Sequence, residues 1–286
     1  MSRTLRLALP KGRITDEVLR LLAAAGLAVK SDGRSYRPLV SDPEIEVKFL
    51  KPQNIPKLIE IGAHDCGFSG HDWVVESEAD VVDVLDTGLD PVTLVVAAPE
   101  STADRLASLN RPLIVAAEFE TISKTYLKKR GQPYVFIRTY GATEVYPPED
   151  ADLILDLVST GTTLRDNHLT VVEEVLRSTT RFLTSRTALE DPWKSERIES
   201  LLTLMKAVLE ARRRVLIEMN VTRENLDAVV AILPAMKSPT IQELHDGKGY
   251  AVKAAIPRQR LAEVLMRLRE AGATDLIAYT LEKVIP

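Results

Sequence analysis

The sequence of 286 residues contains a single cysteine, and it lacks any long uninterrupted apolar run. Cys66 alone cannot form an intrachain disulfide, and we expect it to be a small buried apolar residue. A helix that spans a bilayer needs about 20 consecutive apolar residues, so no membrane span is predicted. The apolar run near the N-terminus is cut short at Pro10, so no secretory signal is predicted either. These absences favour a cytoplasmic protein.

An excess of positive charge is also missing. The chain has 37 Lys and Arg against 41 Asp and Glu, a formal net charge of −4. This balance gives no electrostatic reason to expect a nucleic acid or an anionic membrane as a partner. An anionic small molecule therefore has to be captured by local basic groups. The length predicts two domains or three small ones, with a substantial core.

The most informative stretch is Asp152–Arg165. Its first half is apolar and β-prone, and then come Ser159, Thr160, Gly161, Thr162 and Thr163. From Leu164 to Leu176 the apolar residues recur at roughly helical spacing, which predicts a helix. A strand, a small-residue turn and a helix together direct backbone N–H groups and a helix N-terminus at an anion. Asp156 can hold a sugar hydroxyl or a metal-bound water, so the stretch predicts a pocket for a phosphorylated sugar.

A second candidate anion site is the turn Lys11-Gly12-Arg13, which follows a short predicted strand. Two cations beside a glycine turn are also typical of a solvated surface, so the turn alone is not specific. Asp72 lies at the start of a predicted helix, where it is either a helix cap or a ligand to a bound base or ribose. His64 and His71 have no neighbouring pattern that predicts a zinc site.

Strands alternate with helices up to Val158, which predicts an α/β fold with largely parallel sheets. In such sheets ligands bind beyond the carboxyl ends of the strands, where these turns fall. A long helix is predicted over Trp193–Arg212. From Val215 the predicted order becomes βαββαβ, the ferredoxin-like unit, so we expect a domain boundary near residue 212.

The run from Asp152 to Leu164, with Asn167 and Leu169 following, resembles the signature of the ATP phosphoribosyltransferase family, which catalyses the first step of histidine biosynthesis. Similar segments occur along nearly the whole chain: Leu7–Arg13, Asp65-x-Gly67-x-x-Gly70-x-Asp72, Gly141-Ala142-x-Glu144 and Ser238-Pro239-Thr240-Ile241. The closing βαββαβ module is similar to the regulatory domain of the long form of these enzymes.

The resemblance implies two periplasmic-binding-protein-like lobes that flank a cleft. The expected domains are lobe I over residues 1–90, completed by about 178–211, lobe II over 91–177, and a regulatory domain over 212–286. The implied reaction joins N1 of ATP to the anomeric carbon of phosphoribosyl pyrophosphate and releases pyrophosphate. Mg²⁺ is the implied cofactor, carried on the pyrophosphate with no dedicated protein ligands. Histidine is the implied inhibitor, and the implied assembly is a homo-oligomer, from dimer to hexamer.

The same resemblance assigns roles to individual residues. The residues implied for phosphoribosyl pyrophosphate are Asp156, Ser159, Thr160, Gly161, Thr162 and Thr163, and those for ATP or pyrophosphate are Lys11, Gly12, Arg13 and Asp72. Glu144 and Asp156 are the candidate catalytic groups, although Glu144 is equally typical of a surface carboxylate. The candidates for histidine are Asn220, Ser238 and Thr240, and Asn220 is neutral where some relatives carry an acid.

Two other classes of protein remain open. Two binding-protein-like lobes with a small-molecule module could form a non-catalytic ligand sensor. A phosphoribosyltransferase that acts on a free base is the other alternative. Such enzymes usually carry paired acids before the phosphate loop, whereas Asp156 is followed directly by Leu157.

Overall fold

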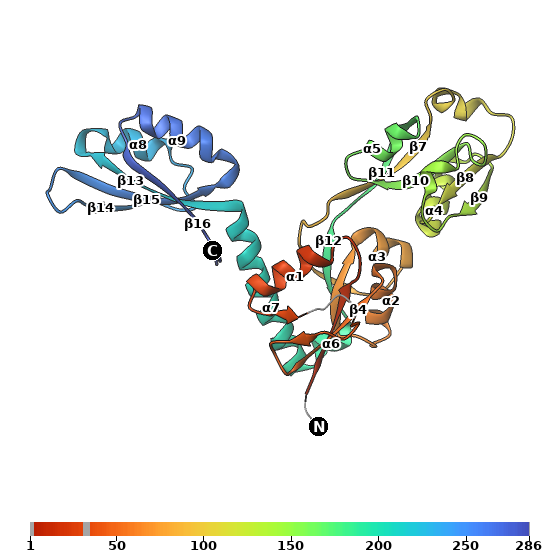
Figure 1. Ribbon diagram of the computed structural model, residues 1–286, viewed down its shortest axis with the longest axis horizontal. Coiled ribbons are helices and arrows are strands. Elements are labelled where there is room, and N and C mark those ends of the chain that lie inside the picture. The colour runs from red at the N-terminus through yellow and green to blue at the C-terminus, as the bar shows by residue number, and fades with distance from the viewer. Residues whose placement is uncertain (1–2, 31–34, 286) are drawn as a thin grey trace. The chain divides into compact units, whose positions relative to one another are not determined.

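The computed structural model describes residues 3–30 and 35–285 of the chain (Figure 1). The chain divides into two compact units. One consists of Met1–Leu19 and Val29–Ile198, and the other of Arg20–Ala28 and Glu199–Pro286. Within the described residues, no helix combines the length and the apolar character needed to cross a membrane.

The first unit contains two five-stranded sheets, and the first sheet has the order β4-β1-β5-β12-β6. Its strands are β1 (Leu5–Pro10), β4 (Ile45–Leu50), β5 (Cys66–Gly70), β6 (Val82–Asp86) and β12 (Thr180–Thr184). The helices that follow its strands are α1 (Thr15–Ala24), α2 (Ile55–Glu60) and α3 (His71–Ser77). Ala8 and Leu183 from the sheet pack against Ile55 and Ile59 of α2, which fixes one face of the sheet.

The second sheet has the order β11-β7-β10-β8-β9. Its strands are β7 (Val92–Pro99), β8 (Leu113–Ala117), β9 (Tyr134–Arg138), β10 (Leu153–Val158) and β11 (Leu169–Ser178). It is accompanied by η2 (Ala103–Ser108), α4 (Glu120–Arg130), η3 (Thr143–Val145) and α5 (Thr162–Asp166). Leu155 alternates with Ile154 between the two faces of the sheet, and both are fully buried, as expected for a central strand covered on both faces.

The expectation of largely parallel sheets is confirmed, with one reversed strand in each sheet. β7 runs antiparallel to β10 and β11, and β12 runs antiparallel to β5 and β6, while the other four strands of each sheet share one direction. The chain passes from the first sheet to the second between β6 and β7, and it returns between β11 and β12. The expectation of a helix from Leu164 to Leu176 is wrong: α5 stops at Asp166, and Leu169–Ser178 is strand β11. Val171, Val172 and Val175 are β-branched, which suits a strand pairing with β7.

The described C-terminal elements form the expected βαββαβ unit. They are β13 (Arg214–Thr222), α8 (Leu226–Ile232), β14 (Thr240–Glu243), β15 (Gly249–Pro257), α9 (Leu261–Glu270) and β16 (Thr274–Thr280). The sheet order is β14-β15-β13-β16, with antiparallel neighbours throughout. Alternate residues of β13 are buried, and Ile217 and Met219 pack with Val264 and Leu268 of α9. Before this unit come α6 (Arg186–Glu190) and the long α7 (Pro192–Arg213).

Candidate active site

The predicted phosphate loop lies between β10 and α5. Gly161 has φ +73°, a left-handed conformation that glycine adopts without strain, and it precedes the first residue of α5. Thr160 Oγ1 and Thr162 Oγ1 are 3.1 Å apart. Among the described residues, the backbone N–H groups of 159–163 make no turn or loop hydrogen bond to another main-chain carbonyl. The loop therefore presents hydroxyl and backbone donors to a ligand.

Asp156 lies on β10, three residues before this loop. Its Oδ1 accepts a 2.8 Å hydrogen bond from the backbone N–H of Leu157. Burial raises the pKa of Asp156 from its ordinary value of 3.8 to about 6, the hydrogen bond opposes the shift, and the charges of Glu144 and Glu118 add to it. Asp156 is therefore a carboxylate at neutral pH, but one close to its protonation range.

A cavity of about 360 Å³ brings the loop and the candidate carboxylates together. Its lining residues are Arg13, Glu144, Asp156, Leu157, Val158, Ser159, Thr160, Gly161, Thr162, Thr163 and Leu164. All six residues expected to bind phosphoribosyl pyrophosphate are in this lining, and Glu144 joins them from η3. The segment that carries Glu144 is fixed by a buried contact of 2.8 Å between Thr139 Oγ1 and Thr143 Oγ1.

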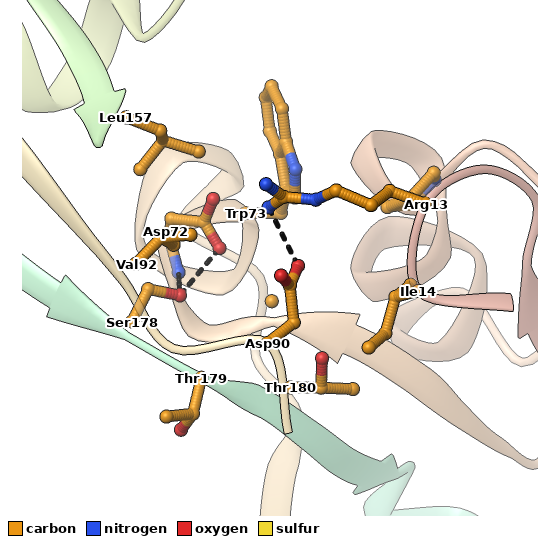
Figure 2. A pocket seen from close by; sticks show the side chains of 12 residues that line it. Arg13, Ile14, Asp72, Trp73, Asp90, Val92, Leu157, Ser178, Thr179 and Thr180 are labelled. Carbon is orange, nitrogen blue, oxygen red and sulfur yellow. Dashed lines mark hydrogen bonds and ion pairs between the residues drawn. The ribbon is translucent and has the colours of Figure 1, made fainter. Parts of the chain in front are cut away.

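A second, smaller cavity of about 150 Å³ contains the candidate Asp72 (Figure 2). Asp72 is 3% exposed at the start of α3, and it does not cap the helix, whose N-cap residue is Gly70. Asp72 Oδ1 accepts a 2.7 Å hydrogen bond from Ser178 Oγ. The backbone N–H of Asp72 donates to Ser178 Oγ at 3.0 Å. Burial raises the pKa of the Asp72 carboxyl, while the Ser178 hydrogen bond opposes that shift.

Arg13 and Leu157 line both cavities, so the two pockets share part of their walls. Arg13 is held by an ion pair of 2.8 Å with Asp90, which Figure 2 shows beside Trp73. Trp73 in turn packs against Phe119, with ring centroids 4.5 Å apart. The wall shared by the two cavities therefore contains one cation and one apolar side chain.

The other two residues of the predicted basic turn are placed differently. Lys11 Nζ lies 4.0 Å from the centre of the Tyr36 ring, a cation–π arrangement. The linings of these two cavities, as far as the structure describes the chain, include neither Lys11 nor Gly12. Trp73, Asp90 and Ser178 were not expected at the site from the sequence, since no motif marks them and only the fold brings them to Arg13 and Asp72.

The candidates for a regulatory ligand are spread over the C-terminal sheet. Asn220 lies on β13, while Thr240 starts β14, and β15 pairs with both strands and separates them. Ser238 and Thr240 are exposed. Asn220 Nδ2 donates a 2.9 Å hydrogen bond to Asp275 Oδ2, so an acid missed at the sequence level lies beside the neutral Asn220.

Comparisons with known proteins agree with these features. The family model described as ATP phosphoribosyltransferase matches residues 51–207, and the model of the HisG C-terminal domain matches residues 211–283. The chain is 39% identical to an ATP phosphoribosyltransferase of Pelotomaculum thermopropionicum and 37% identical to one of Thermodesulfovibrio yellowstonii, in each case over 99% of both chains.

A solved structure supports the fold. The ATP phosphoribosyl transferase (HisG:HisZ) complex from Thermotoga maritima superposes with a TM-score of 0.63 at 23% identity, over 71% of this chain and 99% of that one. The sequence match extends through the C-terminal module and covers the full length of the curated relatives. The chain therefore belongs to the ATP phosphoribosyltransferase family, in the long form that carries its own C-terminal HisG domain.

Proposed function

We propose that this enzyme joins ATP, through N1 of its adenine, to the anomeric carbon of phosphoribosyl pyrophosphate. In this reaction the new N–C bond forms as the bond from the anomeric carbon to the pyrophosphate oxygen breaks. The pyrophosphate leaves with the bonding electrons, and the adenine loses one proton. The observation that carries the proposal is the cavity that combines the loop 159–163 with Asp156, Glu144 and Arg13.

The loop 159–163 binds the 5′-phosphate of the sugar through its backbone N–H groups and its hydroxyls. Asp156, which lines the same cavity, accepts hydrogen bonds from the ribose hydroxyls. As the leaving group departs, positive charge develops at the anomeric carbon, and a partly desolvated carboxylate stabilises it more than an exposed one does. Asp156 therefore has both a binding and an electrostatic role.

ATP occupies the smaller cavity and the wall that it shares with the larger one. Arg13 lies at that wall and meets the phosphates of ATP or the leaving pyrophosphate. Asp72, in the lining of the smaller cavity, hydrogen-bonds the nucleotide. Glu144 is the candidate that removes the adenine proton. Lys11 and Gly12 belong to the same turn as Arg13, and the family resemblance keeps them as candidates for binding ATP or pyrophosphate.

Mg²⁺ is the proposed cofactor, and when bound with the pyrophosphate it would supply positive charge that offsets the charge of this leaving group. Asp156 and Glu144 supply oxygen atoms in the same cavity, which is the ligand type that this ion prefers. In the part of the chain that the structure describes, no group of three or more His, Cys, Asp or Glu is arranged to hold a metal. These residues fit an ion that reaches the site on its substrate.

We also propose that histidine inhibits the enzyme from the C-terminal module, with Asn220, Ser238 and Thr240 as its contacts. Asp275 accepts the Asn220 hydrogen bond and provides a carboxylate for the ammonium group of the inhibitor. A coupling of about 1–3 kcal/mol is the usual scale for such regulation. The proposed assembly ranges from dimer to hexamer, and the cytoplasm remains the expected location.

The direct test measures pyrophosphate release by Asp156→Ala and by Thr162→Val. Both changes remove groups that line the larger cavity, so turnover should fall by at least 100-fold for Asp156→Ala and less for Thr162→Val. Near-normal turnover in both variants would contradict the assignment of this cavity as the phosphoribosyl pyrophosphate site. Incubation with phosphoribosyl pyrophosphate and either ATP or free bases separates this activity from that of a free-base enzyme. A sensor without catalytic activity would release no pyrophosphate with any of them.

A further inference from the structure

A third cavity, of about 200 Å³, lies away from the site described above. Its lining residues are Arg6, Arg37, Glu46, Val47, Lys48, Leu58, Ala63 and His64. Arg6 is near the start of β1, and His64 comes just before β5, so this cavity is at the amino ends of these parallel strands. The turn that carries Arg13 follows the carboxyl end of β1. The two sites therefore lie at opposite ends of the same sheet.

The cations of this cavity outnumber its acids. Arg6 donates to Asp65 through Nη2 at 2.9 Å, and Lys194 Nζ lies 2.8 Å from the same carboxylate oxygen. Those contacts occupy Arg6. By contrast, neither Lys48 nor Arg37 forms an ion pair with any residue in the described ranges 3–30 and 35–285. Glu46 is the one acid of the lining, so two cations that form no ion pair within the described residues face one carboxylate.

His64 adds a largely buried imidazole to this lining. The residue is 9% exposed, and its Nδ1 has no hydrogen-bond partner among the described residues. Burial lowers the pKa of His64, and the positive charges of Lys48, Arg6 and Arg37 lower it further. An anion in the cavity would offset those charges and accept a hydrogen bond from the imidazole.

We propose that this cavity is a second anion-binding site, separate from the catalytic centre, which takes a phosphate group between Lys48, Arg37 and His64. Its volume is far above the roughly 10–15 Å³ that a single water requires. A phosphate offers several acceptor oxygens, and all three side chains can donate to them. Glu46 lies on the same face of β4 as Lys48. Its carboxylate favours an anion that can donate a hydrogen bond to it, and the P–OH group of monoprotonated phosphate can do so.

The test is a titration of the full-length protein with inorganic phosphate, followed by the NMR signals of ¹³C-labelled histidine. The chain has four histidines, so His64 is assigned by one substitution and the other three act as internal references. The His64 ring signal should shift and saturate with phosphate, and its pKa should rise in the complex. Sodium chloride at matched ionic strength should leave it in place. A parallel titration with AMP distinguishes a free anion from the phosphate of a larger molecule.

Lys48→Met removes one cation and keeps the apolar stem, so phosphate should bind about tenfold more weakly. Lys57→Met is the control, because Lys57 is an exposed cation on α2 that pairs with Glu60 and lies outside the lining. It should change the affinity by less than twofold. If Lys48→Met does not fold, Arg37→Gln replaces it. A His64 signal that ignores phosphate, follows chloride equally, or saturates identically in Lys48→Met overturns the proposal.

Discussion

Arg13 Nη2 lies 2.8 Å from Asp90 Oδ2, and this ion pair holds the one cation whose side chain lines both described cavities of the candidate active site. The Arg13 side chain is 64% exposed, so the pair contributes little to stability, on the order of 0–1 kcal/mol. The ion pair instead fixes the position of the Arg13 side chain. Asp90 holds the guanidinium at the wall where the two proposed substrates meet.

Arg13→Gln should therefore reduce kcat/KM by about 100-fold, because it removes charge next to the leaving pyrophosphate. Asp90→Asn keeps the cation and removes only its partner, so a loss of tenfold or less is expected. Lys11→Gln is the comparison, since Lys11 lies against Tyr36 outside both linings. Steady-state kinetics with each substrate varied would check this ranking. A larger loss for Lys11→Gln than for Arg13→Gln would contradict it.

Asp156→Asn should abolish most of the activity and yet stabilise the protein at pH 8. The folded-state pKa of about 6 is above the ordinary value of 3.8, so the free energy of unfolding falls as pH rises between these values. Well above pH 6, the full free-energy cost of keeping the buried Asp156 ionised is present. Since one pKa unit corresponds to about 1.4 kcal/mol, the gain from Asp156→Asn at pH 8 is at most about 3 kcal/mol. At pH 3.5 the gain should vanish.

Asp152→Asn is the matched control, because Arg111 lowers the pKa of that carboxyl on the same segment. It should destabilise the protein at pH 8, the opposite direction. Denaturant titrations at pH 3.5 and pH 8 measure both variants. The wild-type rate should also decline as pH falls through about 6, as Asp156 becomes protonated. A rate that is flat from pH 8 to pH 5 would argue against an ionised Asp156 in the reaction.

The loop and its carboxylate could be predicted from the sequence because their signal is local. A β-prone run that ends in Asp156 and changes to small hydroxyl residues specifies its own turn. The prediction of a helix beyond this loop was wrong because it also depended on a local signal alone. The spacing of Leu169, Val172 and Val175 fits a helix locally, but pairing of Leu169–Ser178 with β7 satisfies the backbone and decides the structure.

Contacts between distant segments could not be predicted in this way. Ser178 reaches Asp72 across 106 positions, and Asp90 reaches Arg13 across 77. Each pair depends on the chain crossing between the two sheets, which no short motif encodes. The one reversed strand in each sheet, β7 or β12, has the same origin. Family resemblance supplied the activity, whereas the partners of the site residues came from the fold.

Ser178→Ala should destabilise the protein and weaken ATP binding more than it affects the sugar phosphate. The change leaves the buried Asp72 carboxylate without its 2.7 Å donor, at a cost of about 1–3 kcal/mol. It should also raise the pKa of Asp72 further. Ser69→Ala is the control, since Ser69 is equally buried but donates to the carbonyl of Pro52. Substrate-specific KM values and thermal unfolding separate the two effects. Equal KM changes in both variants would contradict a role for Asp72.

Gly161→Ala tests the loop geometry. An alanine at φ +73° is strained by about 1–2 kcal/mol, and its Cβ would lie 3.2 Å from Arg165 Nη1. The loop should therefore shift, and KM for phosphoribosyl pyrophosphate should rise about tenfold. Gly131→Ala carries the same backbone strain, with φ +70° and no atom within 4 Å of the added Cβ, at the end of α4. It should lower stability equally and leave KM unchanged, which kinetics and thermal unfolding would show.

Asp275→Asn should weaken inhibition by histidine more than Asn220→Ala does. Asp275 provides the negative charge beside Asn220, and a charged acceptor binds an ammonium group more strongly than a neutral amide does. We expect the histidine concentration for half-inhibition to rise about tenfold in Asp275→Asn and about threefold in Asn220→Ala. Uninhibited turnover should be unchanged in both. Asp246→Asn, on the exposed turn between β14 and β15, is the control for loss of one charge from the module. Inhibition that is equally sensitive to Asp246 and Asp275 would assign the effect to overall charge, and inhibition that neither change alters would place the ligand elsewhere.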